Sequence, residues 1–329
     1  MQPKVSIITV NFNGIRFLKY FFESIKNLHY DNIELIFVDN ASTDGSVDYV
    51  RQNWAGVKVV DNKKNLGFSI ANNIAAERAS GEYLFFLNND TKVHPDAILE
   101  LVKMMSKNSA LGICGCTMMS YDGSVFFHTG IGVDILGFPI ASSVTFYAEG
   151  SALMIRKQLF KEVGEFDPEY FMFHEDIDLA WRVWLLGYQV AAISEAIVYH
   201  SVGASAGGTA LIKEGQYKST YFRRYFSERN NIRTLLKNYG FSALPPILLV
   251  YFLINLAEMS FFLIFLKPRV VFCYLKAYSW NILHLKETLI IREKIQDSRK
   301  IFDSEIFKKM HKGIGKFIVF KKISVPVFE

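Results

Sequence analysis

The sequence predicts an α/β fold, with a Rossmann-like, mostly parallel β-sheet and flanking helices. Two observations support this prediction. Short apolar segments typical of buried strands alternate with segments whose apolar residues recur at helical spacing. Polar residues directly follow several of the apolar segments, at the strand ends where such sheets bind ligands. The chain has 329 residues, half of them hydrophobic, which is enough to bury a sizeable core.

The expected elements follow one another along the chain. Strands are expected at residues 5–10, 33–38, 57–60 and 83–87, and helices at residues 15–28, 46–53, 67–79 and 95–105. Six glycines between residues 110 and 150 predict short strands and loops over the site. Further helices are expected at residues 156–163 and 174–186, strands at 189–193 and 197–199, and a loop at 200–208.

The charge of the chain divides it into two parts. Residues 1–211 carry 16 Lys and Arg against 23 Asp and Glu, a net charge of −7. Residues 212–329 carry 21 against 9, a net charge of +12. We therefore expect an α/β domain over residues 1–211 and a basic, apolar helical region over residues 212–329. Because its basic residues alternate with long apolar runs, this region indicates an anionic membrane surface as partner and no nucleic acid.

Residues 241–266 form an apolar run with Glu258 as its single charge, long enough to span a bilayer. Prolines and Asn255 interrupt the run, and basic residues flank both ends. A single span would place one basic flank outside, against the positive-inside tendency. We therefore expect a helical hairpin, a re-entrant segment or an in-plane pair at the cytoplasmic face of the cell membrane. The alternative for residues 241–266 is a helix buried in a protein core. The alternative for the preceding basic stretch, residues 217–239, is a helix whose charged face is in contact with water.

The cysteines and the N-terminus both indicate a cytosolic chain. Two of the three cysteines form a lone Cys114-x-Cys116 pair, which excludes a disulfide scaffold and predicts reduced thiols. The first apolar segment is too short for the core of a signal peptide, so we expect no targeting signal.

Three motifs carry candidate chemistry. The fourth strand ends in an Asn-Asn-Asp run whose acid, Asp90, suits Mg²⁺ or Mn²⁺, which take oxygen ligands and bridge diphosphate oxygens. A Glu-Asp-Ile-Asp run at residues 175–178 offers Asp176 as a general base for an acceptor hydroxyl. His200, at a strand end, suits a further ligand to an ion held by Asp90. Alone, the first motif favours a capped turn, and the second fits acids at a helix N-terminus as well as it fits a base. A histidine at a strand end is often only a polar residue with its hydrogen bonds satisfied.

The order of the motifs is more informative than any one of them. It runs through residues 39–44, 65–68, 88–90 and 175–178 to His200. On this βα pattern, the order resembles the GT-A glycosyltransferases of family 2, and within them the rhamnosyltransferase-like branch, over about residues 4–205. The resemblance implies an inverting, metal-assisted transfer of a sugar from a dTDP- or UDP-sugar, with rhamnose favoured, to a hydroxyl of a glycan or lipid-linked acceptor in cell-envelope polysaccharide synthesis.

The resemblance also implies roles for individual residues. Asp176 matches the catalytic base, with Glu175 beside it, and Asp90 and His200 match ligands of the divalent metal. Residues implied in nucleotide binding are Val10, Asn11, Asn13, Asp39, Asn40, Ser42, Gly67, Asn72, Asn88 and Asn89. Residues implied on the acceptor side are Gly150, Ser151 and Asp178.

The sequence departs from the family pattern at Asn88, which stands where the D-x-D element has its first acid. An amide is a neutral, weaker ligand, so metal binding depends more on Asp90, His200 and the diphosphate. No Q-x-x-R-W element follows the core, which favours transfer of one or a few sugars over long-chain synthesis.

Two other interpretations remain open at this point. A non-catalytic GT-A-like membrane scaffold or nucleotide-sugar-binding protein is the alternative, although the presence of Asp90, Asp176 and His200 argues against it. A different nucleotide-dependent enzyme on a doubly wound sheet is weaker, because neither G-x-G-x-x-G nor a P-loop follows the first strand.

Overall fold

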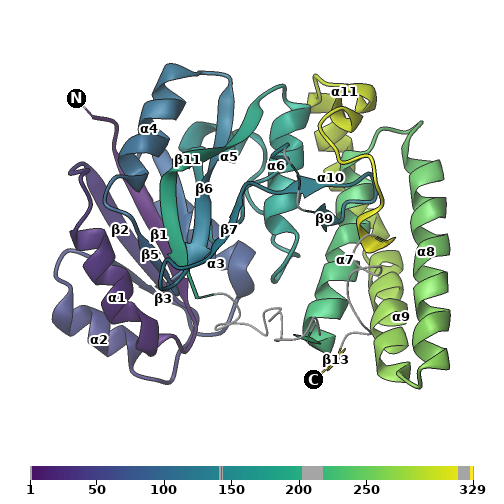
Figure 1. The fold of residues 1–329 in the computed structure, drawn as a ribbon, viewed down its shortest axis with the longest axis horizontal. Coiled ribbons are helices and arrows are strands. Elements are labelled where there is room, and N and C mark those ends of the chain that lie inside the picture. The colour runs from purple at the N-terminus through teal and green to yellow at the C-terminus, as the bar shows by residue number, and fades with distance from the viewer. Residues whose placement is uncertain (1, 141, 143, 202–217, 318–326, 329) are drawn as a thin grey trace.

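The computed structural model describes residues 2–140, 142, 144–201, 218–317 and 327–328. An α/β part occupies the left of Figure 1, and a layer of helices packs against it on the right. The predicted loop at residues 200–208 lies outside the described residues from residue 202 onward.

One mixed sheet organises the α/β part. Its strand order is β3-β2-β1-β4-β10-β6-β11-β5, with β7 paired to β6. As predicted, the first four are parallel: β1 (Val5–Asn11), β2 (Ile33–Asp39), β3 (Lys58–Asp61) and β4 (Tyr83–Leu87). The strands on the far side are partly antiparallel: β5 (Thr91–Val93), β10 (Ala152–Arg156) and β11 (Gln189–His200).

Helices cover both faces of the sheet, which explains why its strands read as nearly continuous apolar runs. One core cluster contains residues of α1 (Ile15–Lys26), α2 (Ser46–Asn53) and α4 (Ala97–Lys107). The other contains residues of α3 (Gly67–Arg78), α5 (Lys157–Glu162) and α6 (Glu175–Leu185).

The prediction for residues 110–150 was wrong in its first part. Residues 111–120 form β6 (Leu111–Ser120), a ten-residue strand inside the sheet between β10 and β11. Its glycines permit close packing and do not break the strand: a Cβ on Gly115 would lie 2.7 Å from the Cβ of Ala148. The remainder contains short strands, as expected: β7 (Phe126–Thr129), β8 (Gly132–Val133) and β9 (Pro139–Ile140).

The helical layer shares a hydrophobic core with the α/β part. It comprises α7 (Tyr221–Asn238), α8 (Leu244–Ile264), α9 (Pro268–Leu283), α10 (Leu285–Ser298) and α11 (Asp303–Phe307), with a small β12 (Lys218–Ser219) and β13 (Val327–Phe328) pair. Trp181 of α6 meets Tyr239, at the end of α7, with ring centroids 4.8 Å apart.

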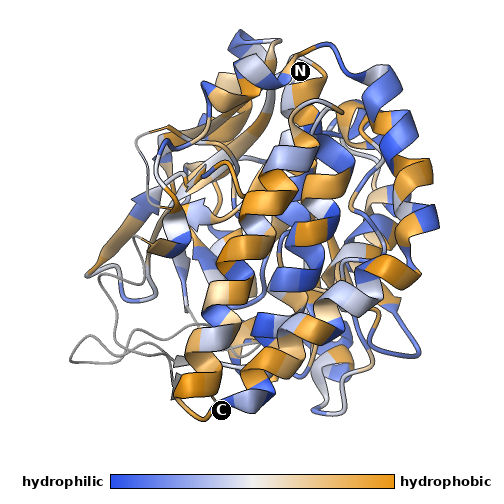
Figure 2. Ribbon diagram, turned by 90° about the vertical axis from the view of Figure 1, so that its right-hand side faces the viewer, coloured by the Kyte–Doolittle hydropathy of each residue, from blue (hydrophilic) through white to orange (hydrophobic). Residues whose placement is uncertain are grey.

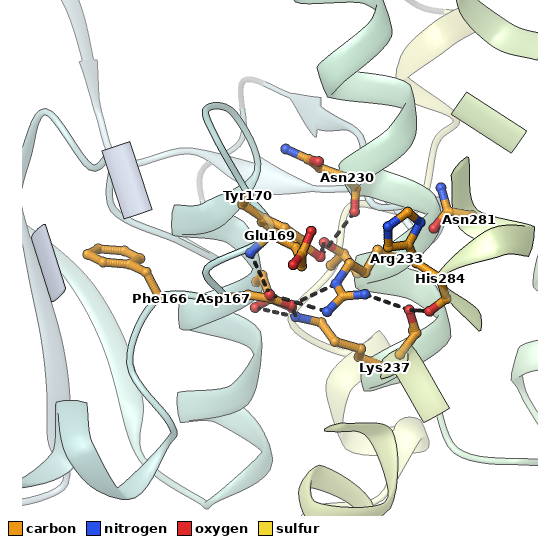
Figure 3. A network of polar contacts seen from close by, with 12 residues as sticks. Phe166, Asp167, Glu169, Tyr170, Asn230, Arg233, Lys237, Asn281 and His284 are labelled. Carbon is orange, nitrogen blue, oxygen red and sulfur yellow. Dashed lines mark hydrogen bonds and ion pairs between the residues drawn. The ribbon is translucent and has the colours of Figure 1, made fainter. Parts of the chain in front are cut away.

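The basic residues of α7 correct the expectation that this stretch meets lipid or solvent. Arg229, Arg233 and Lys237 are at most 6% exposed. Arg233 Nε lies 2.8 Å from Asp167 Oδ2, and Lys237 Nζ lies 2.6 Å from the same oxygen (Figure 3). A buried charge requires such a partner. These cations therefore join the helical layer to the α/β part and are not available to a membrane.

Among the described residues, α8 is the one helix that is long and apolar enough to cross a membrane, judged by length and composition. One stripe of α8 faces the protein, and the two polar residues that interrupted the apolar run lie on that side. Asn255 is fully buried, and Glu258 Oε2 lies 2.7 Å from Lys316 Nζ. Figure 2 faces this side of the molecule, where hydrophobic segments dominate the long helices.

Candidate active site

A cavity of about 1220 Å³ opens at the carboxyl ends of β1 and β4. The starts of β10, α6 and α7 complete its wall. Segments far apart in sequence meet here because β10 pairs with β4, and Asn88 N donates to Ser151 O at 3.0 Å. Twelve of the predicted site residues line the cavity: Val10, Asn13, Asn40, Gly67, Asn88, Asn89, Asp90, Gly150, Ser151, Glu175, Asp176 and His200.

Asn11, Asp39 and Ser42, expected to contact the nucleotide, are not among the residues that line the cavity. Asn11 Nδ2 donates to Asp39 Oδ1 at 2.8 Å and to Ser42 Oγ at 2.9 Å. Ser42 Oγ in turn accepts from the backbone N–H of Asn13 at 2.8 Å. This network fixes lining residues such as Asn13 in place.

Asn72 likewise lies outside the lining, and its side chain bonds back within the first turns of α3. Its Nδ2 donates to Phe68 O at 2.9 Å. Gly67 has a φ of +75°, and a Cβ there would lie 2.4 Å from Phe171 O. Glycine is therefore required at this turn for both its conformation and its lack of a side chain.

Strand pairing brings Asp90 and His200 together. Asp90 immediately precedes β5, whose first residue, Thr91, pairs with His200 at the end of β11. His200 Nε2 lies 3.2 Å from Asp90 Oδ1, and the carboxylate is 1% exposed. Burial lowers the pKa of His200, but the hydrogen bond and charge of Asp90 outweigh burial and raise that pKa above its usual value.

The chemistry of these donors fits Mg²⁺ or Mn²⁺. A buried carboxylate and an imidazole converge at the cavity, and Asn88 adds a neutral amide oxygen beside them. Within residues that the structure describes, no group of three or more His, Cys, Asp or Glu side chains could hold a metal. A protein that supplies few ligands leaves coordination positions for diphosphate oxygens and water, which is typical of Mg²⁺ sites.

The start of α6 supplies two acids to the cavity. Asp176 Oδ2 accepts from the backbone N–H of Gly150 at 3.1 Å, which directs the carboxylate toward the wall formed by residues 149–151. Burial raises the pKa of Asp176 to about 6. Burial and the charge of Asp176 also raise the pKa of Glu175 well above its usual value. Because the two acids are adjacent and both pKa values are raised, the pair titrates as a unit and holds its protons to a higher pH than exposed carboxyl groups do.

The model of the glycosyl transferase family 2 matches residues 6–178, which is more than half of the chain. The chain belongs to glycosyl transferase family 2. The predicted family membership is confirmed.

Three curated relatives are bacterial proteins whose names refer to glycan synthesis or glycosyl transfer. The chain is 27% identical to the O-antigen biosynthesis protein RfbC of Myxococcus xanthus over 67% of its length, and spans 19% of that protein. It is 33% identical to the putative teichuronic acid biosynthesis glycosyltransferase TuaG of Bacillus subtilis over 37% of its length, and spans half of TuaG. It is 26% identical to the N-acetylglucosaminyl-diphospho-decaprenol L-rhamnosyltransferase of Mycobacterium tuberculosis over 67% of its length, and spans 84% of that enzyme.

Solved structures confirm the predicted GT-A fold. The mannosyltransferase PcManGT from Pyrobaculum calidifontis, in complex with GDP-Man and Mn²⁺, matches with a TM-score of 0.55 at 16% identity, covering 91% of this chain and 86% of that one. GalNAc-T7 with UDP, GalNAc and Mn²⁺ matches with a TM-score of 0.60 at 16% identity, covering 74% of this chain and 49% of that one.

One predicted acceptor-side residue of this glycosyltransferase lies elsewhere. Asp178 is fully buried and absent from the cavity lining. Its Oδ2 lies 2.9 Å from both Arg182 Nη2 and Lys237 Nζ. Because α6 turns by about 100° per residue, Asp178 points away from the direction of Asp176. It belongs to the ion-pair network between α6 and α7.

The structure also adds cavity residues that the sequence did not assign to the site. Glu149 lines the cavity, 3.4 Å from His128 Nε2. Thr220, the N-cap residue of α7, also lines it, as do Arg223 and Ser227 of α7. Their i, i+3, i+7 spacing places them on one helix face, and this polar stripe was the signal available in the sequence. The helical layer thus contributes a cation to the glycosyltransferase cavity.

Proposed function

We propose that this glycosyltransferase moves a sugar from a nucleoside diphosphate sugar to an acceptor hydroxyl, with inversion at the anomeric carbon and Asp176 as general base. The observation that carries the proposal is the position of Asp90, Asp176 and His200 in the lining of one cavity. The three side chains come from the turn between β4 and β5, from α6 and from β11, so only the folded chain brings them together.

Asp176 is suited to take a proton from the acceptor. It is ionised at neutral pH, yet its raised pKa makes it a better base than an exposed aspartate. The acceptor hydroxyl transfers its proton to Asp176 as its oxygen bonds to the anomeric carbon. The bond from that carbon to the diphosphate oxygen breaks with its electron pair, and the nucleoside diphosphate leaves. One displacement from the opposite face inverts the configuration.

Asp90 and His200, with Asn88 beside them, are the residues that would hold Mg²⁺ or Mn²⁺. Such an ion, when bound, neutralises the negative charge that develops on the departing diphosphate. The mannosyltransferase PcManGT and GalNAc-T7, which share the fold, were solved with Mn²⁺.

The proposed donor and acceptor are supported by the name of a relative. A dTDP- or UDP-sugar is the proposed donor, with a rhamnosyl group favoured by the relative that is named as an L-rhamnosyltransferase. That relative's name describes a diphospho-decaprenol acceptor, a lipid-linked glycan. We therefore propose a glycan or lipid-linked acceptor here, in cell-envelope polysaccharide synthesis.

A lipid-linked acceptor requires a membrane surface beside the cavity, and the proposed contact is the outer face of α8 and α9. Its exposed apolar residues include Leu249, Phe252, Leu253, Leu256, Leu263 and Ile264 of α8, and Phe272, Leu275, Ile282 and Leu283 of α9. Because Asn255 and Glu258 fix one stripe of α8 to the protein, a hairpin lying in the cytoplasmic face of the cell membrane agrees better with this face than a helix surrounded by lipid.

The experiment is a donor screen with Mn²⁺ that detects released nucleoside diphosphate. Asp176→Asn should lower kcat by about 10²–10⁴-fold and leave donor binding nearly unchanged, because only the base is lost. Asp96→Asn is the matched control, since Asp96 is a partly exposed residue outside the cavity lining. Wild-type enzyme that turns over no donor, or Asp176→Asn with wild-type kcat, would contradict the proposal.

A further inference from the structure

The turn that leads into α6 has an unusual backbone. Phe173 and His174, the two residues before Glu175, have φ angles of +71° and +68°. Residues with a Cβ rarely adopt this left-handed region, and two in succession require neighbours that impose the conformation. The turn immediately precedes the two acids of the cavity, so its conformation decides where the first turn of α6 begins.

Asn230 of α7 supplies the contacts that hold this turn. Its side chain is fully buried, and Nδ2 donates to two successive carbonyl oxygens, Met172 O at 2.9 Å and Phe173 O at 2.7 Å. The other end of the amide is also fixed, because Arg229 Nε donates to Asn230 Oδ1 at 2.8 Å. The amide orientation is thus determined by its partners, with both N–H groups directed at the turn.

The backbone of Asn230 binds the same segment. Tyr170 Oη donates to Asn230 O at 3.2 Å, and the two residues lie together in Figure 3. Residues 170–173 are therefore tied to α7 at three points: one through the main chain of Asn230 and two through its side chain. From α7, this one residue reaches the start of the helix that carries Asp176.

We infer that Asn230 is a positioning residue for catalysis. By holding the left-handed turn at Phe173 and His174, it sets the start of α6 and so aims the Asp176 carboxylate into the cavity, where Gly150 N–H receives it. The inference rests on the proposed role of Asp176 as base. It makes the helical layer a part of the catalytic apparatus as well as a membrane contact.

The chain offers a matched control in the next residue. Asn231 is 2% exposed, and its Nδ2 donates to Leu136 O at 2.8 Å, in a loop that does not line the cavity. Asn230→Leu and Asn231→Leu therefore each replace a buried amide on the same helix by an apolar side chain of similar size. Only the first releases the turn before α6.

The experiment compares the two full-length variants by hydrogen exchange and by kinetics. Asn230→Leu should speed amide exchange over residues 172–178 by at least about tenfold, because the donor that restrains the turn is lost. It should lower kcat by about 10–100-fold at unchanged donor KM, the effect of a base displaced by about 1 Å. Asn231→Leu should change neither quantity.

Two results would overturn the inference. One is an equal rate of amide exchange over residues 172–178 in the two variants. This measurement does not require a known donor. The other is faster exchange in Asn230→Leu with an unchanged kcat. Failure of the proposed function is distinguishable, because it appears in the wild-type enzyme as absence of turnover with every donor.

Discussion

Replacement of Asp167 by Asn should destabilise the protein far more than replacement of Lys237 by Met. Both residues belong to the buried ion-pair network between α6, α7 and the segment before α6. The network holds two carboxylates, Asp167 and Asp178, and three cations, Arg182, Arg233 and Lys237, which gives a net charge of +1. Burial raises the pKa of each carboxyl, but the adjacent cations outweigh burial and keep both pKa values below the usual range.

The two substitutions change this charge in opposite directions. Asp167→Asn raises it from +1 to +2 and leaves Arg233 and Lys237 without their shared carboxylate, which should cost about 3–5 kcal/mol. Lys237→Met lowers it from +1 to 0. Asp167 then keeps its bonds from Arg233 Nε at 2.8 Å and Nη2 at 3.3 Å, and Asp178 keeps Arg182, so the expected cost is about 1–2 kcal/mol.

Urea unfolding followed by tryptophan fluorescence measures both costs. The double variant restores the net charge of +1, so its cost should be smaller than the sum of the two single costs by about 1 kcal/mol or more. An equal or greater loss of stability for Lys237→Met than for Asp167→Asn would refute the charge reasoning.

Three further predictions concern the site and its surroundings. The rate should fall tenfold per pH unit below a pKa of about 6, because burial raises the pKa of Asp176 to that value and only the ionised carboxylate accepts a proton; a pH-independent rate from pH 8 to 4 would contradict this assignment. His200→Gln should raise the Mn²⁺ concentration for half-maximal activity by about 10–100-fold, and an unchanged Mn²⁺ dependence would exclude His200 as a ligand. The wild-type enzyme should co-sediment with vesicles that contain phosphatidylglycerol, and the double variant Leu253→Asp/Leu256→Asp should lose this co-sedimentation. Tyr20→Asp, at an exposed position on α1, is the control and should still bind. Vesicle binding by the double variant would contradict a membrane contact through the α8 face.

Much of the α/β part could be predicted from the sequence. The strands β1 to β4 and the helices α1 to α4 follow from apolar periodicity, which depends on local spacing, whereas the short strand β5 was not predicted. The central strand β6 was missed because Gly112 and Gly115 indicate a loop when read locally. In the structure, glycine is needed there because neighbouring side chains pack against the strand: a Cβ on Gly112 would lie 2.7 Å from Leu159 Cδ2.

The active site, too, could be predicted only in part from the sequence. The residue types and their order along the chain were enough to predict Asp90, Asp176 and His200 as a set, because the chemistry of phosphate, metal and base requires carboxylates and an imidazole. The sequence did not distinguish residues that line the cavity from those that support it. Asn11 and Asp39 are as polar as Asn13 and Asn40, but the pleat and the pairing of β1 with β2 turn them toward each other.

The family and most of the strand–helix pattern could be read from residue identity and spacing, because both depend on local order along the chain. The places that the charges of the helical layer occupy depend on tertiary packing. Net charge and periodicity indicated a basic membrane-facing helix, but Arg233 and Lys237 of α7 pair with carboxylates more than fifty residues away and are buried with them. Burial of a charge depends on a partner in space, and no local pattern records that partner.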